Sequence, residues 1–71
     1  MNKHVLICED SSTTAYLIKS MIEKLGYTAE LATTAMQALE LLNKNKYDLL
    51  TLDMILPDKN GLEVVKEIQN I

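Results

Sequence analysis

The first apolar segment of the chain is short and ends at a pair of acids. Residues 5–8 (VLIC) form a continuous, partly β-branched run that is followed directly by Glu9 and Asp10. Such a run is typical of a strand covered on both faces. Two serines then offer N-caps for a helix, and Gly26 suits its C-terminal end. Within this helix the apolar residues recur at helical spacing: Ala15, Ile18, Met21, Ile22 and Leu25.

A second strand and helix follow at similar spacing. Tyr27 to Ala32 alternates weakly between apolar and polar residues, which predicts a short strand at a sheet edge. Thr34 followed by Gln37 matches a capping box and predicts the start of a second helix. Its apolar face comprises Ala35, Ala38, Leu39 and Leu42. The polar stretch 43–46 is expected to end it.

The third unit repeats the pattern. Tyr47 to Leu52 has an apolar centre and again ends at a carboxylate, Asp53. Pro57 and Gly61 indicate a loop, after which helical spacing resumes at residues 64, 65, 68 and 71. The order βαβαβα predicts an α/β fold with an open parallel sheet, in a single domain spanning residues 1–71.

Composition narrows the class of protein. The 71 residues are 48% hydrophobic and 24% charged, which predicts one folded domain rather than a disordered chain. Cys8 is the only cysteine, so an internal disulfide is impossible, and together with the lack of a signal-peptide pattern this favours the cytoplasm. No apolar run approaches the roughly 20 residues that span a bilayer. The seven lysines form no dense basic block, so we expect neither membrane insertion nor direct nucleic-acid binding.

The acids at the strand ends are the candidate chemistry. Ligands of open α/β sheets bind beyond the carboxyl ends of the strands, where Glu9, Asp10 and Asp53 are expected to meet. Three carboxylates repel one another unless a cation neutralises them, and oxygen ligands suit Mg²⁺. With Mg²⁺ bound, Asp53 can attack a phosphoryl group and become an aspartyl phosphate. A single acid at a strand end is more often merely solvated, but acids ending two strands favour a functional site.

Two segments carry a family resemblance. VLICEDS at residues 5–11 resembles the first strand and acidic pair of response-regulator receiver domains. DMILPDKNGLE at residues 53–63 is similar to the family's phosphoacceptor segment, with proline four and glycine eight residues after the aspartate. The resemblance covers the whole chain and implies the first three βα units of a flavodoxin-like receiver fold. It therefore implies a two-component signalling module rather than an enzyme.

The resemblance also implies the site roles and the partner. Asp53 is the expected phosphoacceptor, taking its phosphoryl group from a histidine kinase. Asp10, Asp53 and the backbone carbonyl of Ile55 are the expected Mg²⁺ ligands, with Glu9 acting mainly through a metal-bound water. Receivers continue through two more βα units, which supply a Ser or Thr and a Lys to the site. Lys59 is the nearest cation in this sequence, and we expect it to be a solvated loop lysine.

The shorter chain suggests an alternative function and an assembly. The third strand becomes a sheet edge, and its unpaired backbone groups favour recruitment of another strand. We expect Val5, Ile7, Leu49 or their neighbours to be partly bare, which indicates a homodimer or higher oligomer. The alternative function is a truncated receiver that acts as a dimeric interaction module without efficient phosphotransfer. His4 is expected at a wet terminus, and Cys8 as a small buried hydrophobe.

Overall fold

Strands and helices alternate within residues 3–53 and 56–69, which the computed structural model describes. The elements are β1 (His4–Cys8), α1 (Ser12–Lys24), β2 (Thr28–Ala32), α2 (Ala35–Lys44), β3 (Leu49–Leu52) and α3 (Gly61–Ile68). The predicted βαβαβα order is confirmed. None of the helices in the described ranges is long and apolar enough to cross a membrane.

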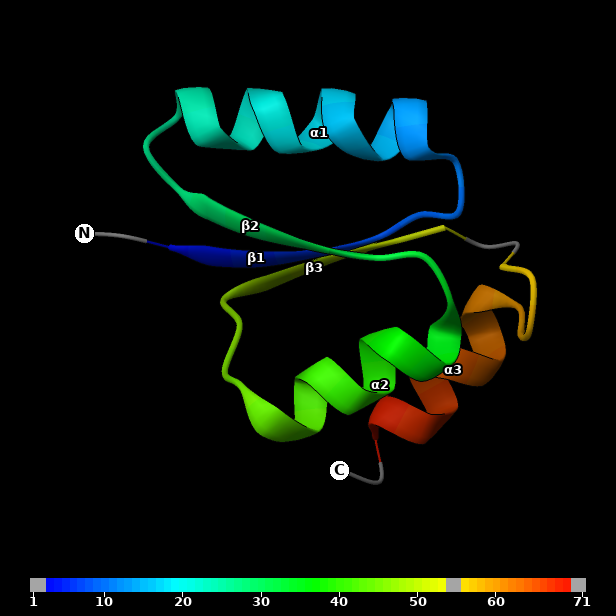
Figure 1. Ribbon diagram of the computed structural model, residues 1–71. Coiled ribbons are helices and arrows are strands. Elements are labelled where there is room, and N and C mark those ends of the chain that lie inside the picture. The colour runs from blue at the N-terminus through cyan, green and yellow to red at the C-terminus, as the bar shows by residue number, and fades with distance from the viewer. Residues whose placement is uncertain (1–2, 54–55, 70–71) are drawn as a thin grey trace.

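The strands form one parallel sheet with helices on both faces. β1 lies in the centre, paired with β2 on one side and β3 on the other. Figure 1 shows α1 on one face of the sheet and α2 and α3 together on the other. An apolar run with no polar position suits β1, because a central strand in such a sheet is covered on both faces. The predicted α/β parallel fold is therefore confirmed.

The larger core lies between the sheet and the pair α2 and α3. Leu6 and Cys8 project into it from β1, and both are almost fully buried. They pack with buried residues from β2, α2, the β3–α3 loop and α3: Ala32, Ala35, Ala38, Leu56 and Val64. The fully buried residues of α2 are the two alanines, while leucine and valine side chains fill much of the rest of this core.

On the opposite face of the sheet, the predicted exposure of two β1 residues is wrong. Val5 and Ile7 alternate with Leu6 along β1, so they face the side covered by α1. Their exposed fractions are only 2% and 0%, so the expectation that they are partly bare is wrong. Leu49 on β3 is 57% exposed, as expected. Val5 and Ile7 differ from Leu49 because α1 contacts β1 and β2. The outer strand β3 is left uncovered on this face.

Helix ends follow the predicted caps with two differences. Gly26 lies just beyond α1 with φ of +89°, the left-handed conformation that favours glycine at this position. Thr34 accepts from the Gln37 N–H at 3.1 Å, but the Gln37 side chain accepts from Thr33 rather than Thr34, so the capping box is incomplete. Gly61 is the first residue of α3 and has no positive φ, so it belongs to the helix rather than to the loop in which it was predicted.

α3 begins three residues before the apolar repeat does, because Asn60 caps it. The Asn60 side chain accepts from the Glu63 N–H at 2.9 Å, and the Glu63 carboxylate accepts from the Asn60 N–H at 3.4 Å. This reciprocal pair is a complete capping box. The N-terminus of α3 is therefore set by a local sequence signal, Asn60 followed three residues later by Glu63.

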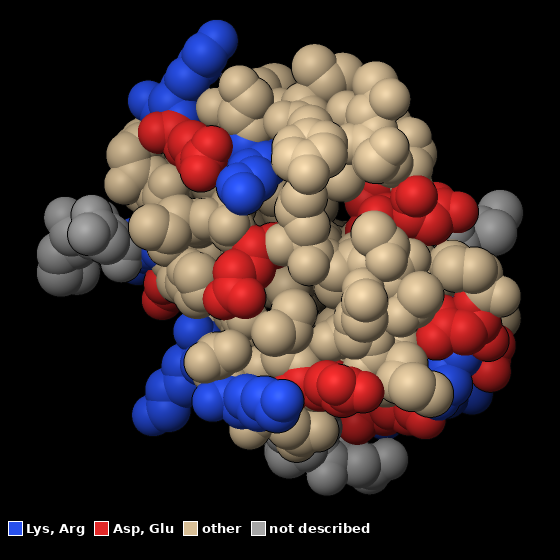
Figure 2. Space-filling model, in the orientation of Figure 1, with Lys and Arg blue, Asp and Glu red and all other residues tan. Residues whose placement is uncertain are grey.

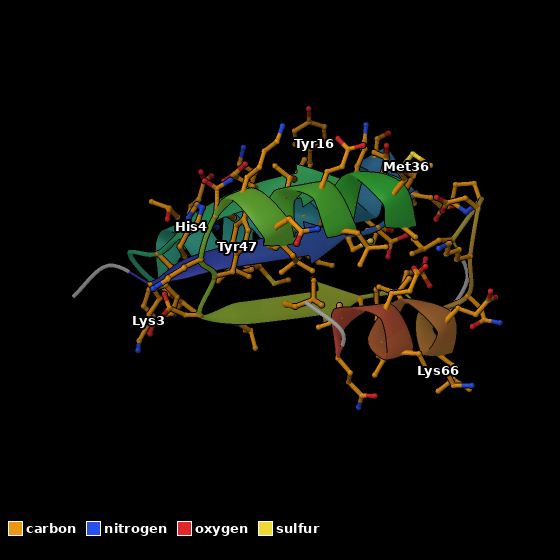
Figure 3. The ribbon with its side chains drawn as sticks, turned by 90° about the horizontal axis from the view of Figure 1, so that it is seen from below. Lys3, His4, Tyr16, Met36, Tyr47 and Lys66 are labelled. Carbon is orange, nitrogen blue, oxygen red and sulfur yellow. The ribbon has the colours of Figure 1, made fainter. Side chains whose placement is uncertain are left out.

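The amino end of the sheet holds a second polar cluster. His4, expected at a wet terminus, is instead the half-buried first residue of β1. Its ring stacks on that of Tyr47, with centroids 4.7 Å apart, and its Nε2 is hydrogen bonded to Glu30 at 2.8 Å (Figure 3). Tyr47 also donates to Glu30 at 3.0 Å. β3 begins at Leu49 rather than at Tyr47 as predicted, and Tyr47 belongs to this cluster before the strand.

Candidate functional site

Strand register places the first and third acidic residues side by side. Cys8 on β1 pairs with Leu52 on β3, so Glu9 and Asp53 are the next residues on neighbouring parallel strands. Backbone bonds extend the sheet by one residue at this edge: the Asp53 N–H donates to the Cys8 carbonyl at 3.0 Å, and the Glu9 N–H to the Ala32 carbonyl at 3.0 Å. The sheet therefore fixes the backbone positions of both acids.

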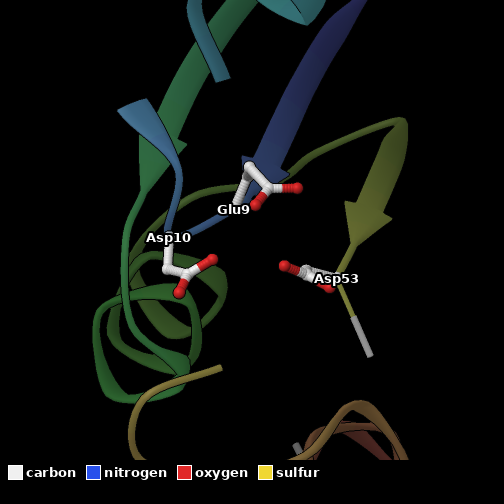
Figure 4. Close-up of side chains that lie close together, drawn as sticks. All are labelled: Glu9, Asp10 and Asp53. Atoms are coloured by element: carbon white, nitrogen blue, oxygen red, sulfur yellow. The ribbon is translucent and has the colours of Figure 1, made fainter. Parts of the chain in front are cut away.

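The three predicted carboxylates meet at this edge (Figure 4). Glu9, Asp10 and Asp53 each offer a carboxylate oxygen, and these oxygens all lie within 4.8 Å of one another. Glu9 and Asp53 are half-buried, whereas Asp10 is exposed. The Glu9 carboxylate also accepts from the Ser11 N–H at 3.2 Å, which holds it at the turn into α1.

Negative charge accumulates at this end of the molecule. In Figure 2, acidic side chains gather on the right-hand side, the end toward which the strands run in Figure 1. The Ser11 N–H lowers the pKa of Glu9, but burial and the neighbouring carboxylates of Asp53 and Asp10 outweigh it, and the net pKa is raised. Burial, followed by the nearby carboxylates, raises the pKa of the Cys8 thiol to about 11. Cys8 is thus an inert buried thiol.

The donor set suits a hard cation. All three side chains offer oxygen ligands, and each carboxylate disfavours ionisation of the others until a positive charge is present. A cavity of about 110 Å³ adjoins the cluster, lined by Glu9 and Asp53 together with Cys8, Ile18, Thr51 and Leu52. Ile55, whose carbonyl is the fourth expected ligand, lies outside the described residues.

Lys59 does not behave as a solvated loop lysine. Its ammonium group forms an ion pair with Glu67 on α3 and is only partly exposed. The expectation of a free solvated side chain is therefore wrong. The pairing ties the β3–α3 loop to the last turns of α3 and directs this cation along the helix.

Asp58 is a residue near the site that the sequence reasoning missed. Its two carboxylate oxygens accept from the backbone N–H groups of Ala35 at 2.8 Å and Met36 at 3.0 Å, at the first turn of α2. These bonds lower the pKa of Asp58, with the Ala35 bond contributing most. The partners are separated by more than twenty residues along the chain, so no local pattern could have revealed the contact.

Comparisons with known proteins all point to the same protein family. The family model for the response regulator receiver domain matches residues 5–71. The chain is 38% identical over 72 residues to the chemotaxis protein CheY of Thermotoga maritima, covering all of this chain and 60% of that protein. It is 34% identical over 71 residues to sporulation initiation phosphotransferase F of Bacillus subtilis, covering all of this chain and 57% of that protein.

Longer relatives and solved structures match in the same way. The aerobic respiration control sensor protein ArcB of Escherichia coli is 38% identical over 65 residues, which are 92% of this chain and 8% of that protein. A response regulator receiver domain from Methylobacillus flagellatus superposes with a TM-score of 0.96 at 31% identity, over all of this chain and 60% of that one. The chain thus spans less than two thirds of the length of each of these proteins.

Proposed function

Because this chain belongs to the response regulator receiver domain family, a signalling module of two-component systems, we propose that it accepts a phosphoryl group on Asp53 with the help of Mg²⁺. The observation that carries this proposal is the convergence of three carboxylates at the carboxyl edge of the sheet. Asp53 lies at the end of β3, next to the central strand, with its backbone held by the Cys8 carbonyl.

The proposed transfer follows from the position of Asp53. One of its carboxylate oxygens forms a bond to phosphorus as the bond from phosphorus to the donor atom breaks, and the departing donor takes up a proton. Glu9 and Asp10 would hold Mg²⁺ together with Asp53, directly or through water, and the carbonyl of Ile55 would complete the set. When bound, Mg²⁺ supplies positive charge that offsets the repulsion between the carboxylate and the phosphoryl oxygens.

The proposed donor is the phosphohistidine of a histidine kinase. Support comes from the relatives, which include a sensor protein and a phosphotransferase by their names. We place the chain in the cytoplasm, where its single buried cysteine would remain a thiol.

The test is phosphorylation by a small acyl phosphate in the presence of Mg²⁺, followed by the mass of the intact protein. We expect the wild type to gain the mass of one phosphoryl group and Asp53→Asn to gain none. Asp48→Asn is the matched control, because Asp48 lies at the amino end of β3, where its carboxylate accepts from the His4 N–H at 2.8 Å. This control should gain the same mass as the wild type. An equal mass gain in Asp53→Asn would contradict the assignment.

A second candidate function rests on the exposed strand β3. Within the described residues β3 pairs only with β1, and Leu49 on it is 57% exposed. A second copy of the chain offers the same unpaired edge, so a twofold pairing of β3 with its copy would satisfy both. On this proposal the protein is a homodimeric interaction module in which phosphotransfer is inefficient. A dimer that gains no phosphoryl group in the assay above would favour it.

A further inference from the structure

Asp58 completes the N-terminus of a helix to which it does not belong. The first backbone N–H groups of a helix have no partner within it, so they need acceptors from elsewhere. In α2 the Gln37 N–H is satisfied by the Thr34 side chain at 3.1 Å. The N–H groups of Ala35 and Met36 are both satisfied by the Asp58 carboxylate.

The negative charge of Asp58 adds an electrostatic interaction to its hydrogen bonds with α2. α2 has no acidic residue in its own first turn, although a negative charge there is favoured by the helix dipole. Asp58 supplies that charge from the β3–α3 loop. Its lowered pKa, caused first by the Ala35 bond, agrees with a carboxylate held in its ionised form by backbone donors.

The loop that carries Asp58 is anchored at several points. Leu56 is only 6% exposed and packs in the core with Ala35 and Val64. Its N–H donates to the Lys59 carbonyl at 3.2 Å, which closes a turn around Asp58. Lys59 then pairs with Glu67 on α3. The loop that follows Asp53 is thus tied to α2 through Asp58 and to α3 through Lys59.

We propose that Asp58 is a positioning residue that couples the carboxylate site at Asp53 to the first turn of α2. Asp58 follows Asp53 by five residues, so a displacement of its loop on ligand binding would reach two helix amides through the Asp58 carboxylate. Met36 is 63% exposed at this turn, and Figure 3 shows it at the same end of the molecule as the β3–α3 loop. The first turn of α2 is then the surface on which site occupancy can be sensed. This inference rests on the proposed function for the identity of the ligand, Mg²⁺.

The test compares Asp58→Ala with Asp48→Ala in the ¹⁵N-labelled chain of residues 1–71. Both changes remove an exposed carboxylate that accepts from a backbone N–H, but at opposite ends of β3. Without metal, we expect Asp58→Ala to accelerate hydrogen exchange at the Ala35 and Met36 amides by about fivefold to tenfold, as for loss of an N-cap. Asp48→Ala should leave those amides unchanged. Unchanged exchange in Asp58→Ala would overturn the contact itself.

A Mg²⁺ titration then tests the coupling. In the wild type and in Asp48→Ala, the amide signals of Ala35 and Met36 should shift along the same binding curve as that of Asp10. In Asp58→Ala the Asp10 signal should still shift, whereas the two α2 signals should not. Equal α2 responses in both variants, or no α2 response in a wild type whose Asp10 responds, would overturn the proposal. A silent Asp10 in the wild type would instead contradict the proposed metal site, and the exchange experiment would then decide the role of Asp58 alone.

Discussion

Ionisable residues at the two ends of β1 experience opposite surroundings. Glu9, at the carboxyl end, lies among like charges and its pKa is raised. Glu30, beside the amino end, receives hydrogen bonds, and its pKa is lowered. The hydrogen bond with His4 is the largest cause, burial opposes it, and the bond from Tyr47 lowers the pKa further. Ionisation of a glutamate is therefore disfavoured by burial and like charges at one end of β1 and favoured by hydrogen bonds at the other.

We predict that His4→Phe returns the pKa of Glu30 toward its ordinary value of 4.5. Phenylalanine keeps a ring to stack on Tyr47 but removes the hydrogen bond. Because a carboxyl with a lowered folded-state pKa stabilises the fold above its unfolded pKa, the contribution of Glu30 is present above pH 4.5 and is lost as pH falls through the lower value. The measurement is the Glu30 carboxyl carbon shift against pH. Tyr47→Phe should move the pKa less, and identical titrations of wild type and His4→Phe would contradict the prediction.

At the scale of elements, each helix has a different kind of start. α1 begins with a side-chain cap from Ser11 at 3.4 Å, α3 has the complete capping box of Asn60, and α2 depends on Thr34 together with the distant Asp58. α3 is also the shortest helix in the described ranges, so its cap secures a large fraction of its length. Helices this short are marginal by themselves and need their caps and packing.

We expect Asn60→Ala to destabilise the protein by about 1 kcal/mol, the usual cost of losing an N-cap side chain. Asn60→Asp is the matched control, because aspartate caps as well as asparagine and adds a favourable charge at the helix N-terminus. Urea unfolding of both variants provides the free energies. Equal losses in the two variants would show that the capping bond to Glu63 is not what stabilises α3.

At the scale of the whole molecule, the two faces of the sheet are unequally covered. α2 and α3 enclose one face, whereas α1 covers β1 and β2 but leaves β3 open on the other (Figure 1). Large apolar side chains are exposed on α1 and β3, including Leu17, Met21 and Leu49. Bare apolar surface beside an unpaired strand edge is typical of an interface.

We predict that the proposed dimer is weakened by Leu49→Lys, at least tenfold in its dissociation constant. Leu49 lies on β3, which within the described part of the chain pairs with β1 alone, and a lysine on such an edge is a common means of blocking further pairing. Leu62→Lys is the matched control, since Leu62 is 58% exposed but lies on α3. Light scattering across micromolar concentrations measures both. A wild type that is monomeric throughout this range would contradict the dimer.

Sequence alone determined the kinds of element, their order and the edge at which the acids meet. These features depend on short-range periodicity, on caps within a few residues, and on the rule that parallel strands end at one edge. Tertiary structure decided the other features. α1 buries Val5 and Ile7, the His4 ring stacks on that of Tyr47, and Asp58 caps α2. Such contacts join residues far apart in the chain. Their energies depend on how helices pack over the sheet, and no local pattern contains that information.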